Sequence, residues 1–232
     1  MLKINPQQFE IFQQQAECQF AQKLQHALAD KYPHILPRFP DEIQLKIVIN
    51  MIDRAKQWGI DWKSSLVIFA ELMISIAPNF DQQTDIKRIL ESNPAQANQR
   101  IKAITESVSD SAWSQAEANS DDLPYFLSSE FLNAPLIDQT ASAIPLVLWD
   151  KVADIDVYQY AISATQYANQ LEFKDLNGAP LTIVVWRSLY GSKFNDSGVY
   201  PWVTDITDNK RPARERIAML KFRIALDHGR MV

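Results

Sequence analysis

The chain has 232 residues, 47% of them hydrophobic and including six Trp and eleven Phe, so it can bury the core of one large domain or two small ones. This content argues against global disorder. The formal net charge of −5 and the pI near 5.2 argue against a general nucleic-acid binder, which needs a basic face to replace phosphate counterions.

Three features of the sequence indicate where the protein resides. No apolar run approaches the roughly 20 residues that span a bilayer. The first residues, Met1–Pro6, lack the apolar segment of a secretion signal. The lone cysteine, Cys18, excludes an internal disulfide and is typical of a reducing compartment. We therefore expect a cytoplasmic protein.

Helical periodicity dominates residues 1–110, which we expect to form an all-helical domain. Residues 6–32 carry apolar side chains at helical spacing, and three prolines between residues 32 and 40 end this helix. Residues 41–58 are a second predicted helix, which Gly59 ends because glycine adopts a left-handed backbone without a Cβ penalty. Residues 64–76 are a third, stopped by Pro78, so that the last two pair as an antiparallel hairpin of helices.

The composition changes near residue 107, where Ser, Ala, Asn and Asp begin to predominate. We interpret residues 111–122 as a linker, with a frayed helix end as the alternative. A short helix is expected over residues 123–132.

Residues 123–232 predict an α+β domain. The apolar run Ile144–Trp149 is typical of a strand with a proline near its start, and residues 155–165 fit either a helix or a strand. The clearest pattern is a β-hairpin, in which Leu171–Leu176 and Leu181–Trp186 flank Asn177-Gly178, a pair favoured in type I′ turns. A C-terminal helix from residue 212 to residue 229 completes the domain. The fold class expected for the whole chain is therefore α+β.

No signature of catalysis, metal binding or cofactor binding stands out. The three histidines are not at metal-ligand spacing with one another or with the cysteine, and five glycines are too few for the dinucleotide-binding patterns. Acid pairs such as Asp205 and Asp208 have spacings too common to indicate catalysis. We predict no catalytic, metal-ligating or cofactor-binding residues, although residues distant in sequence can still assemble an active site.

Charge is unevenly distributed along the second half of the chain. Acidic residues predominate from Asp121 to Asp175, and basic residues predominate from Lys210 to Arg230. One interpretation is that the two regions neutralise one another or face solvent. The other is an acidic surface that binds a basic protein partner.

The aromatic-rich segment between residues 186 and 202 is the candidate partner-binding surface. Aromatic and Arg side chains anchor protein interfaces because they bury much area for little lost rotamer freedom. The alternative is that these aromatics only cover a small sheet. No basic amphipathic stripe accompanies them, so no membrane role is expected. The candidate residues are Trp186, Arg187, Tyr190, Phe194, Tyr200 and Trp202.

The stretch from residue 41 to residue 81 carries a distinctive pattern that the hairpin of helices alone does not require. It reads Arg54-Ala55-x-x-Trp58-Gly59-Ile60, then Phe69-x-x-Leu72-Met73, then Pro78-x-Phe80-Asp81. Together with the preceding helix and the proline break that ends it, this stretch resembles the helical region at the C-terminal end of type VI secretion effector adaptors. It also resembles stand-alone proteins that are encoded in similar gene clusters. The resemblance covers about the first 90 residues. It implies binding to an effector or spike protein, and it implies no catalytic residues.

We therefore expect a non-enzymatic protein that binds a type VI secretion effector or spike protein, as an adaptor or accessory factor. An immunity protein that neutralises a cognate toxin is the first alternative. The second is an effector enzyme with its active site in the C-terminal half. The oligomeric state is left open.

Overall fold

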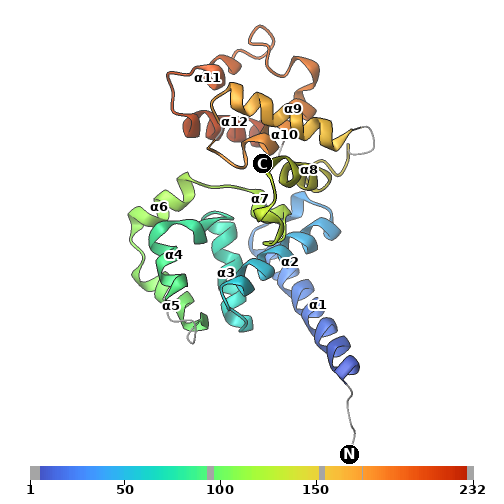
Figure 1. The fold of residues 1–232 in the computed structure, drawn as a ribbon, viewed down its shortest axis with the longest axis vertical. Coiled ribbons are helices and arrows are strands. Elements are labelled where there is room, and N and C mark those ends of the chain that lie inside the picture. The colour runs from blue at the N-terminus through green and yellow to red at the C-terminus, as the bar shows by residue number, and fades with distance from the viewer. Residues whose placement is uncertain (1–5, 93–96, 152–154, 174, 229–232) are drawn as a thin grey trace, which may run out of the picture.

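The computed structural model describes residues 6–92, 97–151, 155–173 and 175–228, and these ranges contain helices and no β-strand. The α-helices lie in two groups joined through a single short helix, α7 (Figure 1). The helices are α1 (Pro6–Lys31), α2 (Asp41–Gln57), α3 (Lys63–Ser75), α4 (Thr84–Glu91), α5 (Ala97–Ser107), α6 (Asp110–Ala118), α7 (Leu123–Phe126), α8 (Leu136–Val147), α9 (Val157–Gln170), α10 (Ala179–Tyr190), α11 (Val203–Thr207) and α12 (Ala213–His228). Short 3-10 turns are η1 (Leu36–Arg38), η2 (Phe80–Gln82), η4 (Phe131–Asn133) and η6 (Gly191–Lys193).

The predicted hairpin of helices is confirmed as α2 and α3. Gly59 has φ of +74°, its N–H donates to Lys56 O, and the next N–H, of Ile60, donates to Ala55 O at 3.2 Å. These two bonds are those of a Schellman motif, which satisfies the last carbonyls of a helix. Ile60 is fully buried, so the turn after α2 is also held by apolar packing.

The first helix is confirmed in its extent, but its apolar face is only partly covered. Leu24 and Leu28 are buried against the core, whereas Phe12 is 59% exposed. Figure 1 shows the N-terminal part of α1 extending away from the other helices. The apolar periodicity predicted this helix correctly. It did not show that other helices pack only against the C-terminal half of α1.

A buried polar network joins α2 to η2 at three residues of the sequence pattern that runs from Arg54 to Asp81. Arg54 donates from Nε and Nη2 to Asp81 Oδ1, at 3.0 and 2.8 Å, and Trp58 Nε1 donates to Asp81 Oδ2 at 2.8 Å. The side chains of Arg54 and Asp81 are 8% and 1% exposed. Because an isolated buried charge is costly, the three residues depend on one another, and the motif fixes the turn after α3.

The short helix α7 links the two groups of helices through hydrogen bonds to α2 and α3. Asn50 Nδ2 donates to Tyr125 O at 2.9 Å, and the Tyr125 hydroxyl donates to Met73 O at 2.8 Å. Just beyond α7, the Ser129 N–H donates to Asp53 Oδ2 at 2.8 Å. These bonds attach α7 to the N-terminal helices, and its other side contacts α8.

The C-terminal group packs around α10, which contacts α8, α9 and α12. The side chains from Leu181 to Trp186 are all buried. Arg216 of α12 is 1% exposed and donates to Ile206 O and Leu171 O, at 3.2 and 2.8 Å. A buried guanidinium bonded to main-chain carbonyls holds α12 to the C-terminal end of α9 and to α11.

The predicted β-hairpin is wrong, and with it the α+β fold class. Leu181–Trp186 lies inside α10, and Gly178 has φ of −75° as the residue before that helix, instead of the positive φ of a type I′ turn. Leu171–Leu176 contains the turns after α9, although Lys174 lies outside the described residues. Pro180 at the second position of α10 fits a helix start. The continuous apolar run belongs to a helix buried on every side, which periodicity cannot distinguish from a buried strand.

The predicted strand Ile144–Trp149 is also wrong. It spans the end of α8 and the turn that follows, and Pro145 stands inside the helix near its C-terminus. Residues 155–165, which the sequence allowed as either helix or strand, lie mostly in helix α9. Its N-cap Asp156 accepts hydrogen bonds from Tyr158 N and Gln159 N. Burial of these helices against one another outweighs the strand preference of their β-branched residues.

The region predicted as a linker or frayed helix end contains helix α6. Ser109 caps it by accepting a hydrogen bond from Ala112 N at 3.3 Å. Residues 119–122 then form the connection to α7, and the short helix expected over residues 123–132 is reduced to α7 and η4. This connection forms one wall of the cleft described next.

Candidate functional site

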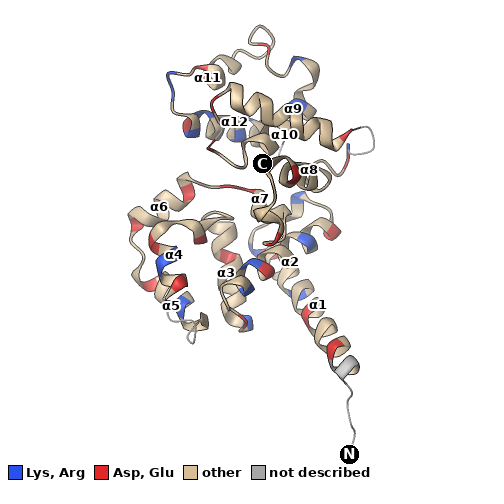
Figure 2. Cartoon of the chain, viewed as in Figure 1, with Lys and Arg blue, Asp and Glu red and all other residues tan. Residues whose placement is uncertain are grey.

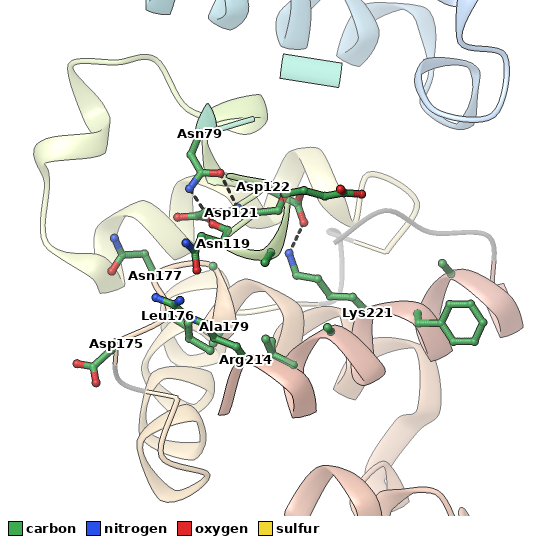
Figure 3. A pocket seen from close by; sticks show the side chains of 18 of the residues that line it. Asn79, Asn119, Asp121, Asp122, Asp175, Leu176, Asn177, Ala179, Arg214 and Lys221 are labelled. Atoms are coloured by element: carbon green, nitrogen blue, oxygen red, sulfur yellow. Dashed lines mark hydrogen bonds and ion pairs between the residues drawn. The ribbon is translucent and has the colours of Figure 1, made fainter. Parts of the chain in front are cut away.

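A cleft of about 520 Å³ lies where the connection between α6 and α7, the turn before α10 and helix α12 come together. Figure 3 shows side chains from these three segments facing the same hollow. Its volume falls in the range of ligand-binding sites in proteins. The lining residues are Arg38, Asn79, Glu117, Ala118, Asn119, Ser120, Asp121, Asp122, Asp175, Leu176, Asn177, Gly178, Ala179, Arg214, Ile217, Ala218, Lys221, Phe222 and Ala225.

Asn79 holds the connection between α6 and α7 in place. Its Nδ2 donates to Asn119 O, and its Oδ1 accepts from the N–H of Asp121, both at 2.9 Å (Figure 3). One side chain from the N-terminal helices therefore fixes both ends of a three-residue segment. The backbone that carries Asp121 is positioned before any ligand arrives.

Asp121 is the most unusual group in the cleft. Its Oδ1 accepts the N–H of Leu123 at 3.0 Å, and this is the only hydrogen bond that its carboxylate makes to the described residues. Burial raises the pKa of this carboxyl above its ordinary value of 3.8, and this effect outweighs the Leu123 hydrogen bond and the attraction of Lys221. The carboxylate also lies against Gly178, where an added Cβ atom would stand 2.7 Å from Oδ1.

The neighbouring carboxylate, Asp122, forms an ion pair with Lys221 of α12. The two side chains are 13% and 23% exposed, so this pair is partly shielded from water. It connects the acidic region of the sequence with the basic one, and Figure 2 shows acidic residues between α6 and α7 and basic residues on α12. The interpretation that the two regions neutralise one another therefore applies at this point.

The rim of the cleft is apolar on α12 and cationic at two positions. Phe222 is 69% exposed, and Leu226, one turn further along α12, is 60% exposed. Arg38 and Arg214 are both exposed and line the cleft. Exposed aromatic and arginine side chains are enriched at protein interfaces.

The predicted partner-binding aromatics lie elsewhere, packed on one another over α10. Trp186 is fully buried, and its ring centroid lies 4.9 Å from that of Phe194 and 5.8 Å from that of Trp202. Tyr190 lies 5.1 Å from Tyr200 and 5.4 Å from Trp202, measured in the same way. Burial, followed by its hydrogen bond to Asp227, raises the pKa of Tyr190. The structure brings the five aromatics together as a covering layer of the C-terminal helices, and Trp186 has no exposed surface for a partner.

Arg187, the sixth predicted residue, stands apart from this layer. It is exposed, its guanidinium lies 4.9 Å from the Tyr160 ring centroid, and its Nη1 donates to Ser163 Oγ at 3.0 Å. Its role in partner binding stays a prediction.

Sequence reasoning missed the cleft residues because no short motif contains them. Asp121 and Lys221 are separated by α7 to α11, and only the contrast of acidic and basic regions hinted that they meet. Within the part of the chain that the structure describes, no group of three or more His, Cys, Asp or Glu is placed to hold a metal ion. In the same ranges, no helix is both long and apolar enough to cross a lipid bilayer.

The chain matches no protein-family model, no curated protein and no solved structure.

Proposed function

We propose that this chain is a non-enzymatic binding protein of a type VI secretion system, which holds an effector or spike protein in the cytoplasm as an adaptor or accessory factor. The partner binds across the cleft and the adjoining face of α12. The observation that carries this proposal is the exposed Phe222 beside a hollow with charged groups of both signs. Exposed apolar groups rimmed by polar ones mark interaction sites. The resemblance of the Arg54–Asp81 stretch to effector adaptors supports the identity of the partner.

Co-purification from the producing cell tests this proposal. The full chain should recover an effector or spike protein encoded beside its gene, and Phe222→Glu should reduce that recovery at least tenfold, because a charge would enter the apolar centre of the interface. Trp62→Glu is the matched control, since Trp62 is 60% exposed and lies at the start of α3, away from the cleft. Recovery of no such partner, or equal loss with both variants, would contradict the proposal.

An immunity protein would bind the same class of partner, a type VI effector or toxin. Deletion of the gene distinguishes this role from that of an adaptor. Loss of secretion without self-killing indicates an adaptor, and self-killing with secretion intact indicates an immunity protein.

A second candidate function is enzymatic, and Asp121 is the observation that favours it. A carboxyl with a raised pKa in a cleft is the property of a general acid. This candidate predicts toxicity when the protein is expressed in a susceptible cell, abolished by Asp121→Asn. Harmless expression of the unaltered chain would exclude it.

A further inference from the structure

We propose that the cleft receives a cationic side chain of the partner, a lysine or an arginine, whose charged group pairs with Asp121. This inference rests on the proposed function, because it names the chemistry by which a protein partner would occupy the cleft.

The carboxylate of Asp121 is half-buried and accepts few hydrogen bonds from the protein. One N–H, that of Leu123, is its only hydrogen-bond donor among the described residues, and Oδ2 is left without a protein partner there. A carboxylate that accepts two or three donors is well compensated, whereas this one has a raised pKa because burial dominates. A cation that enters the cleft would add to the attraction that Lys221 and Arg54 already exert on this carboxylate.

The charge balance of the cleft favours a cation over an anion. Four acids line it, Glu117, Asp121, Asp122 and Asp175, against the three bases Arg38, Arg214 and Lys221. The only ion pair among these seven joins Asp122 to Lys221, which removes one of each sign. The two remaining bases, Arg38 and Arg214, are exposed, whereas Asp121 is half-buried in the wall of the cleft.

The shape of the hollow suits a long side chain with an apolar stem. Leu176, Ala179, Ile217 and Ala218 provide apolar surface in the lining of the cleft. Lys and Arg bury their methylene stems along such surface while the charged head finds a polar partner. The amides of Asn119 and Asn177 also line the cleft and offer hydrogen bonds to the main chain around the inserted residue.

The test is a titration of the full chain with blocked amino acids, followed by the NMR shift of the Gly178 amide beside Asp121. The probes are the N-acetyl N-methylamides of arginine and lysine, and the matched neutral probe is that of citrulline, which has nearly the same shape as arginine without the charge. We expect one of the charged probes to bind about tenfold or more tightly than the citrulline probe, and Asp121→Asn to remove that preference. Asp175→Asn, the same change of charge at an exposed position of the same cleft, should leave it intact.

Several results would overturn the inference. These are equal binding of the citrulline probe, undiminished binding to Asp121→Asn, or an equal loss in Asp175→Asn, which would mean general electrostatic attraction. Putrescine serves as the probe for a free diamine, and binding tenfold tighter than that of blocked lysine would assign the site to a small metabolite instead of a partner side chain. Asp121→Asn retains an oxygen for the Leu123 N–H, and its amide spectrum reports that the chain is folded.

The outcomes separate this inference from the proposed function. If the charged probes bind at Asp121 but no effector or spike protein is recovered from cells, the cation site stands and the adaptor function fails. If the partner is recovered equally by the unaltered chain and by Asp121→Asn, and no probe binds, the function stands and the cation site fails.

Discussion

The buried network around Asp81 offers the sharpest test of what stabilises the N-terminal helices. Asp81→Asn removes the negative charge and leaves the guanidinium of Arg54, 8% exposed, without its counter-ion. Breaking a buried pair from one side typically costs about 3–5 kcal/mol. The substitution also replaces one of the oxygens that receive Arg54 and Trp58 with an amide group that donates, so the network loses an acceptor as well as a charge.

Urea unfolding followed by far-UV circular dichroism measures this loss. We expect Asp81→Asn to lower the unfolding free energy by about 3–5 kcal/mol. Asp85→Asn is the control, because Asp85 is half exposed and pairs with Arg88 at 3.2 Å on the surface of α4, where such a pair contributes about 0–1 kcal/mol. The double variant Arg54→Met with Asp81→Leu should lose less than the two single changes together. A loss below about 1 kcal/mol for Asp81→Asn would refute the view that this ion pair is buried and interdependent.

Three further predictions concern backbone geometry and the cleft. Gly59→Ala should lower the unfolding free energy by about 1–2 kcal/mol, because φ of +74° is unfavourable for any residue with a Cβ, and no loss in urea unfolding would contradict the Schellman turn. Gly178→Ala should cost about 1–3 kcal/mol, because its methyl group would stand 2.7 Å from Asp121 Oδ1, and most of this cost should vanish when Asp121 is also alanine. Asp121→Asn should raise stability at pH 7. The stability that the protonated carboxyl contributes is fully present below its ordinary pKa of 3.8 and is lost as pH rises through the higher folded pKa. The difference between the variant and the unaltered chain, measured from pH 4 to pH 8, should therefore grow with pH, and a difference that shrinks would show that Asp121 is stabilised as an anion.

The N-terminal helices could be predicted because their signals are local. Gly59 stands where only a left-handed residue closes a helix, and Pro78 stands where a helix must stop. The partners of Arg54 could not be predicted, since its pairing with Asp81 depends on how α3 turns back on α2. The motif was visible in the sequence, and its structural reason was not.

The C-terminal half was mispredicted because two local signals conflicted with tertiary packing. Asn177-Gly178 favours a type I′ turn, and the β-branched run after it favours a strand. In the structure, Pro180 begins a helix that α8, α9 and α12 bury on several sides, and burial on every side erases the amphipathic period that identifies helices. Pro145 misled in the same way, since a proline near the end of a helix removes only one hydrogen bond.

The candidate site was beyond sequence reasoning for a different reason. Asp121, Gly178 and Lys221 come from three segments that meet only when α12 packs against α10 and Lys221 reaches Asp122. The aromatic residues chosen instead do gather in space, but their rings contact one another and cover α10. Aromatic content indicates burial at least as often as it indicates an interface.

The attachment of α7 determines the order in which the nascent chain can complete its parts. Residues of α2 and α3 find their hydrogen-bond partners in Tyr125 and Ser129, which are synthesised 52 to 76 residues later. Until then, Asn50 and the carbonyl of Met73 lack those partners, and the surface that Tyr125 covers is open to water. The first six helices therefore depend on a segment beyond their own end, and a polypeptide cut just before Leu123 would be more prone to aggregate than one cut after Ser129.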